Sequence, residues 1–123
     1  MAYANSKTIT FDHTRVQGAD QTDFPVVIAG TYSFLATVAN GGGVINSNGH
    51  YVAFYANIGL TIQLSHEVER YNATTGEVVY WVKIPTLSAS TDTVIYIAYG
   101  DSGISTSQEN ITAVWSSSFV EVF

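Results

Sequence analysis

The sequence predicts an all-β fold, an antiparallel β-sandwich of the jelly-roll or immunoglobulin-like type with one or two short helical turns. Apolar and β-branched runs recur about every ten to twenty residues, and Gly, Asn, Asp and Ser clusters separate them. The chain has 123 residues and no cysteine, so one ordinary-sized core must hold it without disulfides. We expect a single module over residues 1–123, cut from a larger surface or virion assembly or associated with one.

Charged residues are scarce, at 11% of the chain, against about 25% in ordinary domains. The formal net charge is −6, and the four fixed cations are scattered along the sequence. Such a chain cannot neutralise a row of phosphates, so we expect no nucleic-acid partner. A surface rich in neutral polar residues instead suits contact with sugars or packing in ordered arrays.

Nothing in the sequence predicts a membrane span, because no apolar run approaches about 18 residues. The segment Met1–Thr10 lacks a basic region followed by an apolar one, so we expect no signal peptide in this chain. An extracellular, cell-surface or virion location is nevertheless the one we expect. The final residues form an apolar, strand-like run that would suit pairing with another chain, and its candidate assembly residues are Phe119, Val120 and Phe123.

The first half of the chain predicts two strands and a helical turn. Lys7–His13 alternates, with Ile9 and Phe11 on one face. Phe24–Ala29 is a second strand, and Pro25 places it at a sheet edge or at the start of a strand. Ser33–Asn40 has helical spacing and is followed by glycines, which predicts a short turn closed by a left-handed residue.

The rest of the chain predicts four more strands. We expect strands at His50–Tyr55 and Leu64–Tyr71, a hairpin from the latter to Glu77–Ile84, and a central strand at Thr93–Tyr99. Pro85 is expected to end the third of these. A short helical turn is expected within Ser107–Val114.

Alternation also assigns faces in the hairpin. Leu64, His66, Val68 and Arg70 should face one way, and Ser65, Glu67, Glu69 and Tyr71 the other. Each of the two tryptophans, Trp81 and Trp115, lies within an apolar run, so both are expected in the core.

Several segments occur together in a recognisable order. They are Phe24–Ile28, His66–Glu69, Trp81–Pro85, Asp92–Gly100 and Ala113–Trp115. In this order they resemble a bacterial, archaeal and phage family of unknown function, whose members usually precede concanavalin A-like, laminin-G-type jelly-roll domains. The resemblance runs from about Lys7 to Phe123. It implies a β-sandwich accessory module of adhesins, glycan-active enzymes or phage structural proteins, and it carries over no catalytic residues. The chain departs from the family pattern at Tyr51–Gln63, where it is apolar and aromatic.

The aromatic residues give the clearest indication of a ligand. Eight tyrosines and two tryptophans are more than a core of this size needs. Tyr51 and Tyr55 share one face of a predicted strand and are our candidates for stacking against sugar rings. Packing in the core or between subunits is the competing interpretation of the same two residues.

Metal binding and catalysis have weaker support. Calcium is the only cofactor that the sequence suggests, through loop oxygens of Asp20, Asp23, Asp101 and Asn110. His13, His50 and His66 lack metal-ligand spacing. Glu67 and Glu69 share a strand face and would suit acid–base glycoside chemistry, but a solvated strand face explains them equally well. We therefore expect no enzyme.

Two functions remain open from the sequence. The first is a non-catalytic carbohydrate-binding or adhesion module, with a glycan or polysaccharide as partner. The second is a structural assembly module that forms a homo-oligomer or contacts a neighbouring jelly-roll domain. The first rests on the tyrosine-rich strands, and the second on the apolar C-terminal run.

Overall fold

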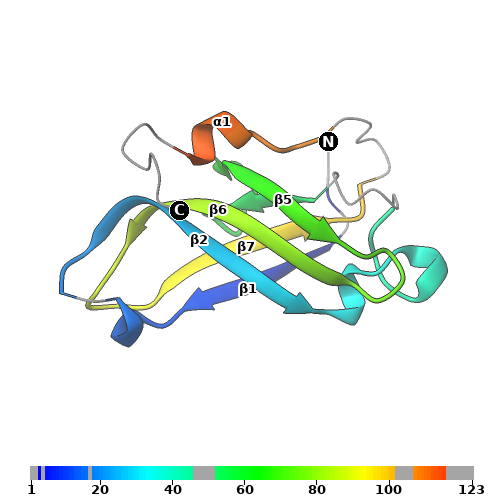
Figure 1. Cartoon of the computed structure of the whole chain (residues 1–123), viewed down its shortest axis with the longest axis horizontal. Helices are drawn as coiled ribbons and strands as arrows, with labels where there is room; N and C mark the ends of the chain where they lie inside the picture. The colour runs from blue at the N-terminus through cyan, green and yellow to red at the C-terminus, as the bar shows by residue number, and fades with distance from the viewer. Residues whose placement is uncertain (1–2, 4, 17, 46–51, 102–106, 116–123) are drawn as a thin grey trace.

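A computed structural model of the chain has two antiparallel sheets packed face to face (Figure 1). It describes residues 3, 5–16, 18–45, 52–101 and 107–115. The strands are β1 (Asn5–Phe11), β2 (Gln21–Thr31), β3 (Ala53–Tyr55), β4 (Gln63–Leu64), β5 (His66–Tyr71), β6 (Glu77–Leu87) and β7 (Thr93–Tyr99). The helical turns are η1 (His13–Arg15), η2 (Ser33–Leu35), η3 (Val38–Asn40) and α1 (Ile111–Val114). The predicted β-sandwich with short helical turns is confirmed.

The larger sheet has the order β1-β7-β3-β4, and the smaller has the order β2-β6-β5. As predicted, β7 is a central strand: it pairs with β1 on one side and with β3 on the other. The smaller sheet is centred on β6, with β2 at one edge and β5 at the other. The edge position predicted from Pro25 is therefore confirmed.

The core fills the space between the sheets. Every second residue of β6 points into it, and Val78, Tyr80, Val82 and Ile84 are at most 1% exposed. From the larger sheet come Phe54, Leu64, Ile95, Ile97 and Tyr99, with Val52 just before β3, while Ile9 and Phe11 pack against the cluster as predicted. This alternation is the period of two that a strand with one buried face requires.

The predicted turn at residues 33–40 is confirmed as two consecutive 3-10 turns. Gly41 caps η3 with φ of 92°, and its N–H donates to the carbonyl of Val38. The left-handed conformation is easy for glycine and costly for residues that carry a Cβ. The turn places Leu35 in the core and Phe34 beside the ring of Tyr99.

Two details of the predicted strands are wrong. The segment Leu64–Tyr71 is divided, because β4 belongs to the larger sheet and β5 to the smaller one, with Ser65 between them. The strand containing Trp81 does not stop before Pro85 but continues to Leu87. Opposite Pro85 the ladder is already interrupted at Asp23, whose φ is 48°. A residue without an N–H is tolerated at such a point.

A β-bulge corrects the faces assigned to β5. The register shifts between Val68 and Arg70, so Glu69 has no partner in the ladder. Beyond the bulge the alternation reverses. Tyr71 packs against the core and donates its hydroxyl to the carbonyl of Leu35 at 2.6 Å, while Arg70 is exposed. One extra residue is enough to exchange the two faces, because the side-chain period of a strand is two.

Candidate functional site

The outer face of the smaller sheet carries an aromatic and acidic surface. Across the three strands, Val27 lies opposite Trp81, and Trp81 lies opposite Glu67. Their neighbours in sequence, Val26, Tyr80 and Val68, face the core. Val27, Trp81 and Glu67 therefore point away from it. The core position predicted for Trp81 is therefore wrong. It sits on the outer face and is only partly buried.

Trp115 completes this surface. Its ring centroid lies 5.2 Å from that of Trp81, and the two planes are inclined at 58°. Trp115 is also only partly buried, so its predicted core position is wrong as well. Each indole N–H donates to a carboxylate at 2.6 Å, Trp81 to Oε1 of Glu69 and Trp115 to Oε1 of Glu67. We call these four residues the Trp–Glu surface.

The segment before Trp115 is tied to the free edge of β5. The N–H of Asn110 donates to the carbonyl of His66 at 3.0 Å, and Oε2 of Glu109 accepts the N–H of Val68 at 2.7 Å. The short helix α1 follows, contacts β5 and β6, and buries Val114 completely. In Figure 1, α1 lies along the β5 side of the sandwich. These bonds satisfy an exposed strand edge and hold Trp115 beside Trp81.

The chemistry of the Trp–Glu surface suits a neutral, polyhydroxylated ligand. The indole rings offer apolar area, and both indole donors are already satisfied. Each indole bond uses one oxygen of its carboxylate, and the second oxygen is able to accept a further hydrogen bond. Sugar rings present C–H faces for stacking and hydroxyls for hydrogen bonding, so they match both features. The alternation of the strand predicted that Glu67 and Glu69 share a face. It gave no sign that Trp81 and Trp115 lie beside them outside the core.

The predicted stacking residue Tyr55 is placed differently. It is 7% exposed, and the ring of Tyr3 lies over it with 6.2 Å between the centroids and an edge-on angle of 65°. Burial raises the pKa of Tyr55 above its ordinary value. A ring so covered presents no face to a sugar in this structure. Tyr51 lies outside the described residues.

The aspartates predicted to bind calcium do not form one group. Asp20 accepts the N–H of Ala89 at 2.8 Å, close to the start of β7, whereas Asp101 is buried just beyond its end. With about 3.3 Å of rise per residue, β7 keeps these two ends more than about 20 Å apart. Asp23 is exposed on β2, and Asn110 precedes α1. The separation arises because the loops in question lie at opposite ends of the sandwich.

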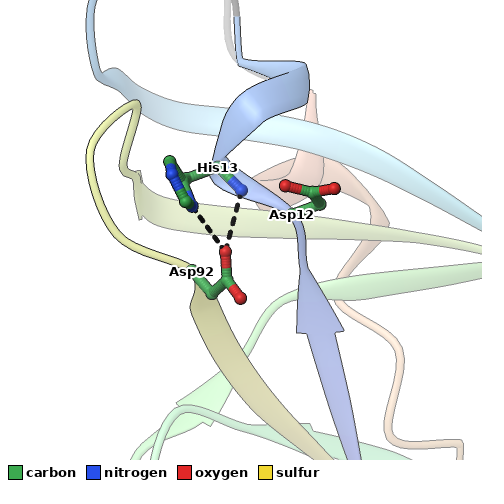
Figure 2. Close-up of side chains that lie close together, drawn as sticks. All are labelled: Asp12, His13 and Asp92. Atoms are coloured by element: carbon green, nitrogen blue, oxygen red, sulfur yellow. Dashed lines mark hydrogen bonds and ion pairs between the residues drawn. The ribbon is translucent and has the colours of Figure 1, made fainter.

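The described residues contain a different potential metal group, Asp12, His13 and Asp92, whose ligand atoms lie within 4.8 Å of one another. Figure 2 shows it at the junction of β1, η1 and the start of β7. Oδ1 of Asp92 accepts both the backbone N–H of His13 at 3.1 Å and its ring Nδ1 at 2.7 Å. Oδ1 of Asp12 accepts the N–H and hydroxyl of Thr14. The bonds between His13 and Asp92 join the segment after β1 to the segment before β7. We therefore interpret the group as a polar clamp between these two segments.

The hydrogen bonds of this clamp lower the pKa of both carboxyls. For Asp92 the main cause is the side-chain bond from His13, followed by the backbone bond. For Asp12 it is the hydroxyl of Thr14, followed by the backbone N–H of Thr14. From the sequence, His13, His50 and His66 were not expected to form a metal site together, because they lack metal-ligand spacing. His66 is fully buried between the rings of Phe54 and Tyr80, and His50 lies outside the described residues.

The candidate assembly residues Phe119, Val120 and Phe123 also lie outside the described residues. None of the helices in the described part of the chain has the length and apolar character needed to cross a bilayer.

The geometry thus defines an antiparallel β-sandwich domain whose smaller sheet has an aromatic and acidic outer face. The model of the family described as Domain of unknown function (DUF2341) matches residues 48–123, which is more than half of the chain. The chain belongs to this family, whose function is unknown, as expected from the resemblance to a family of unknown function. The match begins at residue 48, so it does not include Phe24–Ile28, the first of the segments on which the resemblance rested. Comparison with the curated proteins and with the solved structures gives no match.

Proposed function

We propose that this domain is a non-catalytic carbohydrate-binding or adhesion module that binds glycans on the Trp–Glu surface. The observation that supports the proposal is the pairing of two partly exposed indoles with two carboxylates on a single sheet face. A sheet face is a rigid support, so little ordering entropy would be lost on binding. The proposed setting is a surface or phage protein outside the cell, next to a jelly-roll domain as the family resemblance implies.

Each indole would stack against one sugar ring. The inclination of 58° between the rings disfavours a flat platform that holds two rings in one plane. It suits a bent or branched saccharide whose adjacent residues turn relative to each other. Glu67 and Glu69 would accept hydroxyl hydrogens beside the rings, which would give orientation in addition to apolar contact. The shortage of cations on the chain makes strongly anionic polysaccharides poor partners.

A glycan array, run with and without millimolar calcium, tests this proposal. Specific binding by the wild-type protein should fall by about tenfold or more in Trp81→Ala and in Trp115→Ala, because each removes one stacking contact. Tyr96→Ala is the matched control, since Tyr96 is a partly exposed aromatic residue on the outer face of the larger sheet. Glu67→Gln and Glu69→Gln should weaken binding less, because glutamine retains one acceptor oxygen.

Two outcomes would contradict the proposal. One is the absence of binding to any glycan by a folded protein. The other is binding that Trp81→Ala leaves intact, or that Tyr96→Ala abolishes equally. Circular dichroism of every variant separates loss of binding from loss of fold.

An assembly module is the second candidate, and one observation favours it. The tip between β3 and β4 exposes two large apolar side chains, Ile58 at 76% and Ile62 at 58%. The side chain of Asn57 holds this tip rigid: its oxygen accepts the N–H groups of Thr61 and Ile62, and its amide donates to the hydroxyl of Thr61. Light scattering on wild type and Ile58→Ser tests this candidate. Oligomers that Ile58→Ser disrupts would favour it over glycan binding.

A further inference from the structure

The two carboxylates of the Trp–Glu surface have no cationic partner. Glu67 and Glu69 each accept an indole N–H, which is a neutral donor. The ion pairs in the described part of the chain involve Asp92 and Glu77, and neither pair includes these two glutamates. The second oxygen of Glu67 is not among the described buried polar atoms that lack a partner, and Glu69 is exposed. A ligand on this face can therefore reach both carboxylates.

The charged groups around these carboxylates do not cancel them. Arg70 lies beside the bulge, but its Nε pairs with Oε1 of Glu77 at 3.5 Å. Lys83 follows Trp81 by two residues on β6 and shares its face, so it lies diagonal to Glu67. One ammonium group against two carboxylates leaves the Trp–Glu surface negative. The formal net charge of −6 adds to the attraction for a cationic group.

A primary ammonium group on a ligand matches this surface better than a hydroxyl does. It has three N–H donors and a full positive charge, so it forms charge-assisted hydrogen bonds with carboxylates. The indoles of Trp81 and Trp115, whose centroids are 5.2 Å apart, also favour a cation, because the faces of aromatic rings attract positive charge. A metal ion would use the carboxylates alone, whereas an organic ammonium ion uses the apolar area of the indoles as well.

We propose that the glycan bound on the Trp–Glu surface carries a free amino group, so that the sugar recognised is a 2-amino-2-deoxyhexose. Its ammonium group donates to the carboxylates of Glu67 and Glu69, and its ring stacks against one of the two indoles. This inference rests on the proposed function, because it names the class of glycan that the same surface binds. Acetylation of the amine removes the charge, so an N-acetylated sugar loses the advantage.

The indole N–H signals in heteronuclear NMR spectra test this inference directly, because the chain has two tryptophans and both belong to the surface. The whole chain is titrated with three methyl glycosides that differ only in the group at carbon 2, which is an amine, a hydroxyl or an acetamide. The set is run in the gluco and the galacto series, at mildly acidic pH so that the amine is protonated. In at least one series, wild type should bind the amino sugar about threefold to tenfold more tightly than either of the others.

The decisive variant is the double substitution Glu67→Gln and Glu69→Gln. Glutamine keeps an acceptor oxygen for each indole N–H but carries no charge, so the variant should bind the amino and hydroxyl sugars equally. Asp23→Asn is the control for lost charge elsewhere. It lies four residues before Val27 on β2, roughly 13 Å along the strand and beyond the screening length of about 8 Å. Asparagine tolerates the positive φ of Asp23, so this variant should fold and keep the preference.

Each unfavourable result has a distinct meaning. Equal binding of the amino and hydroxyl sugars by wild type overturns this inference but leaves the proposed function intact, since the surface still binds a sugar. A preference that survives in the double variant, or that Asp23→Asn also removes, overturns it as well. If no sugar shifts either indole signal, the assignment of an amino sugar fails, and the glycan array decides the proposed function separately.

Discussion

Trp81 on β6 and Glu69 on β5 are joined by a hydrogen bond of 2.6 Å from the indole N–H to Oε1. They are not partners in the ladder, because Trp81 lies opposite Glu67 and Glu69 is the extra residue of the bulge. The bulge turns Glu69 toward Trp81 and leaves Glu67 to accept the indole N–H of Trp115. One irregularity in a strand thus lets two neighbouring carboxylates serve two indoles, and the Trp–Glu surface depends on it.

Replacing Trp81 by alanine should cost modest stability. A tryptophan in the core would cost about 3–5 kcal/mol. On the outer face the expected loss is about 1–2 kcal/mol, from the contact with Trp115 and partial burial. Urea denaturation measures the difference. Tyr80→Ala is the reference, because Tyr80 is 0% exposed on the core side of the same strand. If both variants lost the same free energy of unfolding, Trp81 would have to be a core residue.

Tyr71 should make the fold sensitive to alkali. Burial raises the pKa of Tyr71 to about 12 from its ordinary value of 10.0. The unfolded chain therefore loses this proton first. The stabilising contribution is complete below pH 10 and is lost as the pH rises from about 10 toward about 12. Denaturation of wild type across this range should show a decline that is shallower in Tyr71→Phe.

The same substitution should also lower stability at neutral pH. Tyr71→Phe leaves the carbonyl of Leu35 without its donor, and the expected cost is about 1–2 kcal/mol. A variant as stable as wild type at neutral pH, or one with the same alkaline decline, would contradict the role given to this hydroxyl.

Gly76 should not tolerate a side chain. Its φ is 80°, and an added Cβ would lie 2.0 Å from the carbonyl oxygen of Tyr32, which is backbone and cannot move freely. We expect Gly76→Ala to cost about 3 kcal/mol or more, from strain and the clash together. Gly18→Ala is the matched control, since Gly18 has a φ of 77° but nothing within 4 Å of the added atom. It should cost about 1 kcal/mol. Similar melting temperatures for the two variants would show that Tyr32 does not pack there.

The clamp between His13 and Asp92 should be visible in a titration. The side-chain bond from His13 is the main cause that lowers the pKa of Asp92 below 3.8. Its contribution to stability is therefore present above the unfolded value and is lost as the pH falls through the lowered one. NMR titration of the Asp92 carboxyl should show its pKa rising in His13→Ala. An unchanged pKa would mean that the clamp does not form in solution. Both groups are exposed, so added salt should weaken the effect.

Much of the fold could be predicted from short stretches of sequence. The alternation identified Ile9 and Phe11 in β1, and His66 and Val68 in β5, as residues that face the core, because a strand with one buried face must alternate. The glycines after Asn40 predicted the left-handed cap at Gly41, which is a local conformational requirement. Pro25 predicted a sheet edge or the start of a strand, because proline has no N–H to donate to a ladder, and β2 is at an edge.

The candidate site could be predicted only in part. Glu67 and Glu69 were recognised as two carboxylates on one strand face. Asp12 and Asp92 were missed, because they are 80 residues apart and no local pattern relates them. Trp81 and Trp115 were assigned to the core because apolar composition does not distinguish the two faces of a strand in an apolar run.

The sequence by itself determined the all-β class, the approximate strands and the inward-facing residues of β1 and of β5 before its bulge, since these follow from local conformational preference and a period of two. The tertiary structure alone decided where β4 and β5 part to join different sheets and where the bulge at Glu69 reverses the faces. It also decided which distant loops share an end of the sandwich and that Trp115 lies against Trp81. These depend on contacts between segments far apart in the chain, whose energies balance only when the whole sandwich is packed.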